Sequence, residues 1–297
     1  MNVKNNIESN WMQSLMQGQQ PSDSDLREHL LAVHRDNAGF TEACALRCKD
    51  RLGRNSYELL ANTVDPCRHS HVLDLACGSG VLLEVCRKLC GPNAELTGVD
   101  MSAEELALAQ QRRLGPNAKL YEGVAQNLCF IDDGMINVVL CHWALTLMDQ
   151  VPLVLKEVRR VLKPDGIFSA VVDGDPATAP DYMEIHDLIY NFVQREHPNY
   201  GKIDLGDPRV RSGQAIKQLA IESFEGARID IEPIVFDLYD APDILARKAA
   251  GFFYATFVLS PPAHSQMLQE LEAFFAGQRK ADRCRFALPV NKLVVYQ

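Results

Sequence analysis

The chain has 297 residues, of which 47% are hydrophobic and 23% are charged, and this composition excludes a largely disordered protein. Its 39 acidic residues outnumber its 30 basic residues, for a formal net charge of −9, which argues against a nucleic-acid substrate. No apolar run approaches the ~18 residues of a membrane span, and the first residues lack a signal-peptide pattern. The 9 cysteines include no C-x-x-C pair, which favours free thiols over a zinc or redox site. We therefore expect a cytoplasmic protein that binds neither nucleic acid nor membranes.

The start of the chain predicts a tail followed by helices. Residues 1–24 are mainly polar and predict a mobile tail, in which Trp11, Leu15 and Met16 are the side chains able to dock. Between residues 26 and 60 the apolar residues recur at helical spacing, which predicts two or three helices before any strand. We assign residues 25–68 to these helices and expect them to form part of a cap.

Strands and helices alternate in the next hundred residues. The predicted strands cover 72–76, 95–99, 119–122, 135–141 and 167–172, and the helices between them cover 81–89, 102–113 and 151–162. Such alternation is typical of βαβ units and a parallel sheet. The sequence therefore predicts an α/β fold with a doubly wound, Rossmann-like sheet whose core lies in residues 69–175.

The pattern changes to longer helices after this core. Helices are predicted at 182–196, 214–224, 244–259 and 266–275, and strands at 227–238 and 292–296. We assign residues 176–226 to a cap insertion, and residues 227–297 to the C-terminal part of the core with additional helices. The apolar segment 286–289 precedes the final strand, and these two late strands predict an antiparallel edge hairpin formed by the C-terminal segment.

A glycine loop after the first predicted strand indicates a ligand site. Gly78 and Gly80 lie where the strand runs into a helix, so the backbone and the free amides of the helix N-terminus can approach a ligand closely. Asp100 ends the second strand, where a carboxylate accepts hydrogen bonds from ribose hydroxyls. Leu83 stands where the dinucleotide fingerprint requires a third glycine, which disfavours NAD. A nucleoside-bearing cofactor is therefore predicted; the alternative is a tight turn beside an acid that caps a helix.

Four segments of this region resemble the motifs of class I S-adenosylmethionine-dependent methyltransferases. In chain order they are 72–80 (VLDLACGSG), 96–102 (LTGVDMS), 123–130 (GVAQNLCF) and 159–166 (RRVLKPDG). The resemblance implies a seven-stranded methyltransferase sheet with helical cap additions, and S-adenosyl-L-methionine as the cofactor. Two positions depart from the family pattern: Ala76 replaces the first loop glycine, and Val124 replaces the acid that binds the adenine amino group. Gln126, Asn127 or backbone groups would then make the adenine contact.

The resemblance also implies which residues surround the cofactor. Asp100 would hold the ribose, Met101 would pack on the adenine, and residues 76–80 would lie along the amino-acid part. Asp74 is a buried acid beside the glycine loop, where it organises either the loop or a cationic ligand. The predicted cofactor-binding residues are Tyr57, Asp74, Ala76, Cys77, Gly78, Gly80, Asp100, Met101, Ala125, Gln126, Asn127 and Cys141.

The protein's task in methyl transfer is mainly to align the acceptor with the methyl group, and a hydroxyl acceptor also benefits from a base. The end of the fourth strand faces the methyl group in this fold, which makes His142 the first candidate base and Trp143 a wall of the pocket. Asp173 is the second candidate. Each has a plainer alternative: a backbone hydrogen bond for His142, a core position for Trp143 and a turn cap for Asp173. Metal-using relatives place an acid at the end of strand four, where this chain has Cys141, so we predict no metal.

The acceptor predicted by elimination is a small molecule. The amino-group motif Asn/Asp-Pro-Pro-aromatic is missing at residues 141–144, which disfavours nucleic-acid bases and glutamine side chains as acceptors. The predicted substrate-binding residues are His142, Trp143, Tyr182, His186, Phe253 and Tyr254. We expect methylation of oxygen, nitrogen or carbon in a specialised metabolite. The alternative is a binding protein that keeps the cofactor fold without catalysis, as a sensor or assembly partner.

Overall fold

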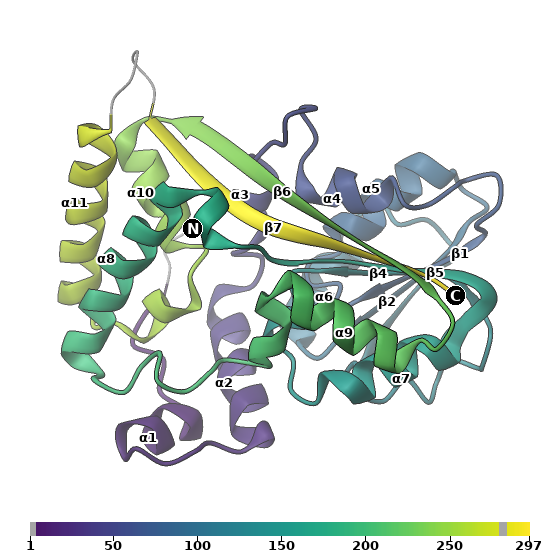
Figure 1. The fold of residues 1–297 in the computed structure, drawn as a ribbon, viewed down its shortest axis with the longest axis horizontal. Helices are drawn as coiled ribbons and strands as arrows, with labels where there is room; N and C mark the ends of the chain where they lie inside the picture. The colour runs from purple at the N-terminus through teal and green to yellow at the C-terminus, as the bar shows by residue number, and fades with distance from the viewer. Residues whose placement is uncertain (1–3, 279–283) are drawn as a thin grey trace. The chain divides into compact units, whose positions relative to one another are not determined.

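The computed structural model describes residues 4–278 and 284–297, and the chain divides into two compact units (Figure 1). The sheet unit comprises Arg54–Asp175, Gly206–Ile234 and Val290–Gln297. The helical unit comprises Met1–Gly53, Pro176–Leu205 and Val235–Pro289. These boundaries differ from the predicted ones, because residues 54–68 and 206–226 belong to the sheet unit and not to a separate cap.

The strands form one seven-stranded sheet in the order β3-β2-β1-β4-β5-β7-β6. Their bounds are His71–Leu75 (β1), Glu95–Asp100 (β2), Ala118–Glu122 (β3), Ile136–His142 (β4), Leu162–Asp173 (β5), Arg228–Asp240 (β6) and Cys284–Tyr296 (β7). The pairs among β1 to β5 are parallel. The chain leaves β1 towards β3 and then returns to β4 on the other side of β1. The carboxyl end of β1 therefore lies at the switch point where doubly wound sheets bind ligands, and the predicted fold class is confirmed.

The far edge of the sheet differs from the prediction in one respect. Strand β7 pairs antiparallel with β5, as expected for the C-terminal segment. However, β7 is one long strand, and its outer neighbour β6 precedes it by two helices, so the predicted hairpin is wrong. Pro289 does not divide this strand, because the ladder with β5 ends at the pair of Asp173 with Val290. The missing N–H of Pro289 therefore falls outside that ladder.

Helices cover both faces of the sheet within the sheet unit, with α4 and α5 on one face and α7 and α9 on the other (Figure 1). Their bounds are Ser56–Ala61 (α4), Val81–Cys90 (α5), Ala103–Gln110 (α6), Val151–Val161 (α7) and Gly213–Ser223 (α9), with 3-10 turns at Leu145–Leu147 and Pro208–Arg211. Helix α7 buries Val154, Val158 and Val161 in a core that also contains Phe168 of β5 and Leu219 of α9. Apolar residues three and four positions apart thus form the face that meets the sheet.

The helical unit contains the remaining helices. Their bounds are Asn10–Met16 (α1), Asp23–Asn37 (α2), Glu42–Ala45 (α3), Pro180–Glu196 (α8), Pro242–Ala250 (α10) and Pro261–Gly277 (α11), with 3-10 turns at Pro176–Thr178 and Tyr254–Val258. The predicted tail, residues 1–24, contains α1, because Trp11 and Leu15 are buried and anchor it, whereas Met16 is 61% exposed. The helix predicted at 244–259 ends at Ala250, where Gly251 follows and a 3-10 turn begins three residues later.

Three general properties of the described residues bear on function. Among the helices of residues 4–278 and 284–297, none has both the length and the apolar character that crossing a membrane requires. Within the same ranges, no group of three or more His, Cys, Asp or Glu side chains is arranged to hold a metal ion. All the cysteines of the chain are free thiols.

Candidate active site

The loop after β1 has a left-handed backbone at three positions. The φ angles of Ala76, Gly78 and Gly80 are 57°, 50° and 78°. A Cβ atom at Gly80 would lie 2.9 Å from the Cβ of Ala109 in α6, so only glycine fits there. Ala76 adopts the same region at a cost of about 1 kcal/mol, because its Cβ crowds the following carbonyl. The loop thus keeps the shape predicted for a ligand-binding turn, although alanine replaces the first glycine.

Asp100 joins this loop to the loop after β2. Its Oδ2 accepts a hydrogen bond from the Gly78 amide at 2.7 Å, and its Oδ1 accepts one from the Ser102 amide at 2.9 Å. Ser102 is the N-cap of α6, so the carboxylate also fixes the start of that helix. Asp100 therefore lies at the glycine loop, where the sequence predicts a ribose-binding acid. It also accepts hydrogen bonds from two backbone amides of the protein.

Asp74 is the most unusual group of the site. It lies inside the sheet, paired with Gly98 of β2 and Leu140 of β4, and only 1% of it is exposed. In the described part of the chain, neither of its carboxyl oxygens has a hydrogen-bond partner. Burial, assisted by the nearby charge of Asp100, raises the pKa of Asp74 well above its usual value. A buried acid without partners is costly, so the site suits a ligand that brings a positive charge or hydrogen-bond donors.

His142 ends β4 and is held by the first turn of α4. Its Nε2 lies 2.7 Å from the hydroxyl oxygen of Ser56, and the ring of Tyr57 stacks on its imidazole with centroids 3.9 Å apart. Burial lowers the pKa of His142 to about 3, so the ring is neutral at physiological pH. A histidine with this pKa is a weak proton acceptor, which works against the predicted role of a general base. Tyr57, predicted to contact the cofactor, is buried on His142.

Trp143 and Asp173 lie beside His142, at the carboxyl ends of β4 and β5. Trp143 has a φ of 57°, which is uncommon for a bulky side chain and is typical of strained residues at ligand sites. Burial raises the pKa of Asp173, while the charge of Arg211 and the Trp143 side chain act in the opposite direction. The Nε of Arg211 is 3.6 Å from Asp173 Oδ2. Asp173 is thus a stronger base than an ordinary carboxylate, but it also pairs with Arg211.

The loop predicted to bind adenine is organised by an acid that the sequence did not reveal. Gln126 donates two hydrogen bonds from Nε2 to Asp149, one to its carbonyl oxygen and one to its Oδ1, both at 2.9 Å. Asn127 uses its side-chain oxygen to accept the amide of Cys129 at 3.3 Å. Because the amide nitrogen of Gln126 faces Asp149, its oxygen is the atom left for a ligand. This oxygen is the acceptor type that the missing acid at Val124 would supply.

The remaining predicted cofactor residues differ in accessibility. Cys77, Ala125 and Cys141 are buried, and Met101, next to Asp100, is half-buried. Burial raises the pKa of Cys141 to about 12, so its thiol stays protonated. Only the backbone of the buried residues is therefore suited to contact a ligand, whereas the Met101 side chain is accessible.

The predicted substrate residues after 180 belong to the helical unit. Tyr182, His186 and Phe253 form one aromatic cluster, in which Phe253 lies 5.5 Å from Tyr182 and 6.1 Å from His186 between ring centroids. Tyr254 lies in a different cluster, where its hydroxyl is 2.8 Å from His34 Nε2 and its ring meets Phe40. The structure thus brings three of the four residues together, and their role towards a substrate stays a prediction.

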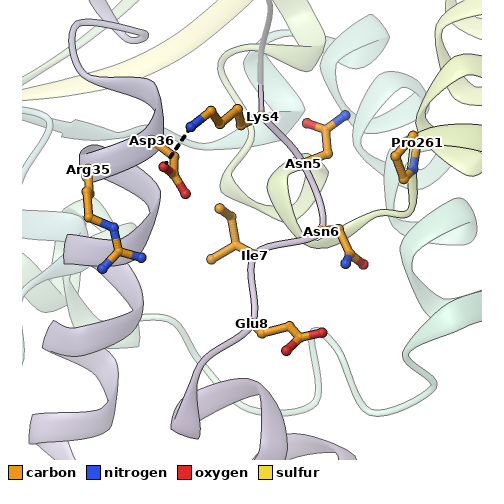
Figure 2. A pocket seen from close by; sticks show the side chains of 8 residues that line it. All are labelled: Lys4, Asn5, Asn6, Ile7, Glu8, Arg35, Asp36 and Pro261. Carbon is orange, nitrogen blue, oxygen red and sulfur yellow. Dashed lines mark hydrogen bonds and ion pairs between the residues drawn. The ribbon is translucent and has the colours of Figure 1, made fainter.

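A cavity of about 550 Å³ lies elsewhere in the helical unit, between the extended segment before α1 and helix α2 (Figure 2). Lys4 and Asp36 form an ion pair at 3.2 Å across it. Its walls are formed by Lys4, Asn5, Asn6, Ile7, Glu8, Arg35, Asp36 and Pro261. None of these residues was predicted to bind the cofactor or the substrate.

Comparison with known proteins agrees with the geometry at the end of β1. The family model described as "Methyltransferase domain" matches residues 72–166, which include the glycine loop, Asp74 and Asp100. Residues 72–166 are thus similar to a methyltransferase domain. Demethylmenaquinone methyltransferase of Staphylococcus aureus (strain JH9) is 32% identical over 132 residues, 44% of this chain and 53% of that protein. The chain therefore spans about half the length of this curated relative.

The similarity to two solved structures covers more of the chain than residues 72–166. The cyclase SpnF has a TM-score of 0.58 at 16% identity, with coverage of 94% of this chain and 97% of that one. Phosphoethanolamine N-methyltransferase 2 of Haemonchus contortus, solved with S-adenosylhomocysteine, has a TM-score of 0.54 at 14% identity, with coverage of 93% and 60%. At these identities the likeness shows the fold alone, and a fold hosts more than one reaction.

The residues of the methyltransferase domain fit S-adenosylmethionine, which carries a sulfonium and an ammonium group. The unpartnered carboxylate of Asp74 fits a cationic ligand, and Asp100 beside the glycine loop fits a ribose. These two acids are the features of the domain that fit the cofactor, and which residues bind it stays a prediction. Sequence reasoning missed Ser56, Asp149 and Arg211, and no local pattern around them signals a role.

Proposed function

We propose that this protein transfers the methyl group of S-adenosylmethionine to a small-molecule acceptor. The observation that carries the proposal is Asp74, a buried acid that has no hydrogen-bond partner among the described residues and lies beside a glycine loop in a segment that matches a methyltransferase domain. A buried charge is retained only where a partner compensates its desolvation. A cationic cofactor is such a partner, whereas a neutral ligand or a dinucleotide with two phosphates is not.

In this proposal the protein binds and aligns, and the bound cofactor supplies a methyl group on a positively charged sulfur. Asp100 holds the ribose while it keeps the glycine loop in place through Gly78. Gln126, oriented by Asp149, accepts the adenine amino group. Asp74 compensates positive charge at the amino-acid end. His142 and Trp143 line the side of the site where the acceptor enters.

The acceptor that we propose is planar and at least partly aromatic. The S. aureus relative is named for a demethylated menaquinone, a molecule with a fused ring and oxygen substituents. The predicted substrate residues Tyr182, His186 and Phe253 carry aromatic rings, which are of the kind that pack on planar rings, and their part in binding the acceptor stays a prediction. Methylation at a ring carbon or a ring oxygen is therefore favoured over methylation of an aliphatic amine.

A strong general base is not needed for such an acceptor. The ionised form of a phenol or enol is reactive without proton removal in the transition state, so alignment accounts for most of the rate. Asp173, whose pKa burial raises, is the better placed proton acceptor of the two predicted candidates. His142, with its pKa lowered to about 3, contributes as a neutral ring.

A second candidate function is supported by Val124. Val124 departs from the family pattern of an acid at this position, and this departure fits a binding protein that has kept the fold without catalysis. The likeness to a cyclase of the same fold illustrates that the fold does not fix the reaction. A protein of this kind binds the cofactor but transfers no methyl group.

Two measurements separate these candidates. Calorimetry with S-adenosylmethionine, S-adenosylhomocysteine and NAD tests the cofactor, and the proposal expects binding of the first two only. Incubation with methyl-labelled cofactor and demethylmenaquinol, or with a small-molecule extract of the source organism, tests transfer. Binding without label transfer would favour the silent protein. The nine free thiols are in line with a cytoplasmic location, which remains part of the proposal.

A further inference from the structure

The contact between Ser56 and His142 is closely defined. Ser56 is the first residue of α4 and is 1% exposed. Its hydroxyl oxygen lies 2.7 Å from Nε2 of His142, and the described part of the chain offers this hydroxyl no other hydrogen bond. Tyr57, the next residue of α4, stacks on the same imidazole at an interplanar angle of 20°. Two consecutive side chains of one helix turn therefore fix both the plane and one edge of the His142 ring.

The direction of this hydrogen bond follows from burial. A buried hydroxyl hydrogen without an acceptor is costly, and Nε2 of His142 is its acceptor in the described residues. If Nε2 carried the proton instead, the Ser56 hydroxyl would accept and its own hydrogen would have no partner. Ser56 therefore donates to Nε2. In a neutral imidazole the single ring proton must then be on Nδ1.

The opposite nitrogen is available to a ligand. Nδ1 of His142 makes no hydrogen bond within residues 4–278 and 284–297. This atom is also not fully buried, unlike the partnerless polar atoms of the protein interior. A group at the carboxyl end of β4 can therefore reach it. Because burial lowers the pKa of His142 to about 3, the neutral form with a proton on Nδ1 is the species present at physiological pH.

We propose that Ser56 is a positioning residue that holds His142 in the Nδ1–H tautomer, so that His142 donates a hydrogen bond to an oxygen of the methyl acceptor. This inference rests on the proposed function and narrows its substrate class to phenols and enols. A hydrogen bond to the anionic oxygen stabilises the ionised acceptor, which is the reactive form. In this role His142 favours the anion without removing a proton itself.

A second serine–histidine pair in the chain provides a matched control. In the helical unit the Ser9 hydroxyl lies 2.9 Å from Nδ1 of His29, and both residues are buried. Loss of the hydroxyl in Ser9→Ala removes the same kind of contact from a histidine outside the candidate site. The Oγ of Ser9 also accepts a hydrogen bond from the Met12 amide, so Ser9→Ala lowers the stability of the protein as well. The control therefore shows whether a general loss of stability alone changes the His142 signals.

The test is nitrogen NMR of the full chain labelled with ¹⁵N-histidine, without cofactor and at neutral pH. The His142 resonances among the eight histidines are assigned by their loss in His142→Gln. We expect a protonated Nδ1 and an unprotonated Nε2, which resonates far downfield of a protonated nitrogen. In Ser56→Ala the Nε2–H tautomer should become populated, whereas Ser9→Ala should leave the His142 signals unchanged.

Kinetics provide the second measurement. With a phenolic or enolic acceptor, Ser56→Ala should lower kcat about 10-fold and change the KM for S-adenosylmethionine less than 2-fold, whereas Ser9→Ala should change neither. A protonated Nε2 or an imidazolium in the wild-type protein, or unchanged His142 signals in Ser56→Ala, would overturn the inference. Unchanged kcat in Ser56→Ala would also overturn it. An Nδ1–H tautomer in a protein that transfers no methyl group would instead refute the proposed function and leave the assignment of the tautomer intact.

Discussion

Replacement of Asp74 by asparagine should make the free protein more stable and the bound cofactor weaker. The carboxylate has no hydrogen-bond partner in the described residues, and burial raises its pKa well above its usual value of 3.8. An unpartnered buried group of this kind costs about 1–3 kcal/mol. Asparagine keeps the shape of the side chain but does not ionise, so folding no longer requires a buried carboxyl group to take up a proton, and Asp74→Asn should recover about 1–2 kcal/mol at pH 7. For a chain of this size that corresponds to an increase in Tm of about 2–6 °C.

The sign of the pH dependence follows from the raised pKa. Above pH 3.8 the unfolded chain loses the Asp74 proton while the folded protein retains it up to the raised pKa. The folded state therefore becomes less stable, relative to the unfolded state, as pH rises through this window. The stability advantage of Asp74→Asn should accordingly be small near pH 4 and grow towards pH 8. Asp132→Asn, which removes an exposed carboxylate of the same unit, should show no such trend.

The assay combines thermal unfolding from pH 5 to 8 with calorimetry of S-adenosylmethionine binding. We expect the variant to bind the cofactor at least 10-fold more weakly, because the compensating charge is gone. A variant that is less stable than the wild-type protein at pH 7 would refute the idea that Asp74 lacks a partner. Unchanged affinity would show that Asp74 does not face the cofactor.

Two further substitutions test the loops of the site, and a third, at Gly206, tests a close backbone contact of the sheet unit. Asp100→Ala should weaken S-adenosylmethionine binding by about 1–3 kcal/mol in calorimetry, and equal affinity would exclude Asp100 as the ribose ligand. Ala76→Gly should be neutral or stabilise by up to about 1 kcal/mol in urea unfolding, because Ala76 has a φ of 57°; a clear loss would contradict this strain. Gly206→Ala should destabilise by about 2–4 kcal/mol, since its Cβ would lie 2.3 Å from the Thr146 carbonyl oxygen, and a mild effect would argue against this close approach.

The sheet was predictable because its strands carry a strong local signal. Strands β1, β4 and β5 are buried on both faces and appear as short apolar runs between helical patterns. The glycine loop and Asp100 were predictable for the same reason, since both are tied to strand ends. The pairing of β6 with β7 at the far edge of the sheet could not be predicted, because no local sequence pattern in β7 indicates a partner strand that lies two helices earlier in the chain.

The partners of the site residues could not be predicted from the sequence. Ser56 is 86 residues away from His142, and only the packing of α4 on the sheet brings them together. Asp149 follows a 3-10 turn and contacts Gln126 from 23 residues away. Phe253 and Tyr254 are sequence neighbours, yet a turn directs them into different clusters. Tertiary contacts of this kind depend on helix placement, which periodicity does not determine.

The most direct test of the account is transfer of a labelled methyl group. The full chain is incubated with methyl-labelled S-adenosylmethionine and a demethylmenaquinol or another phenolic acceptor, and the products are separated from the cofactor. The account predicts labelled acceptor and an equal amount of S-adenosylhomocysteine, both reduced in Asp100→Ala and in Asp74→Asn at cofactor concentrations that do not saturate these variants. Binding of NAD in place of S-adenosylmethionine, or tight binding of S-adenosylmethionine without transfer to any small molecule, would contradict it.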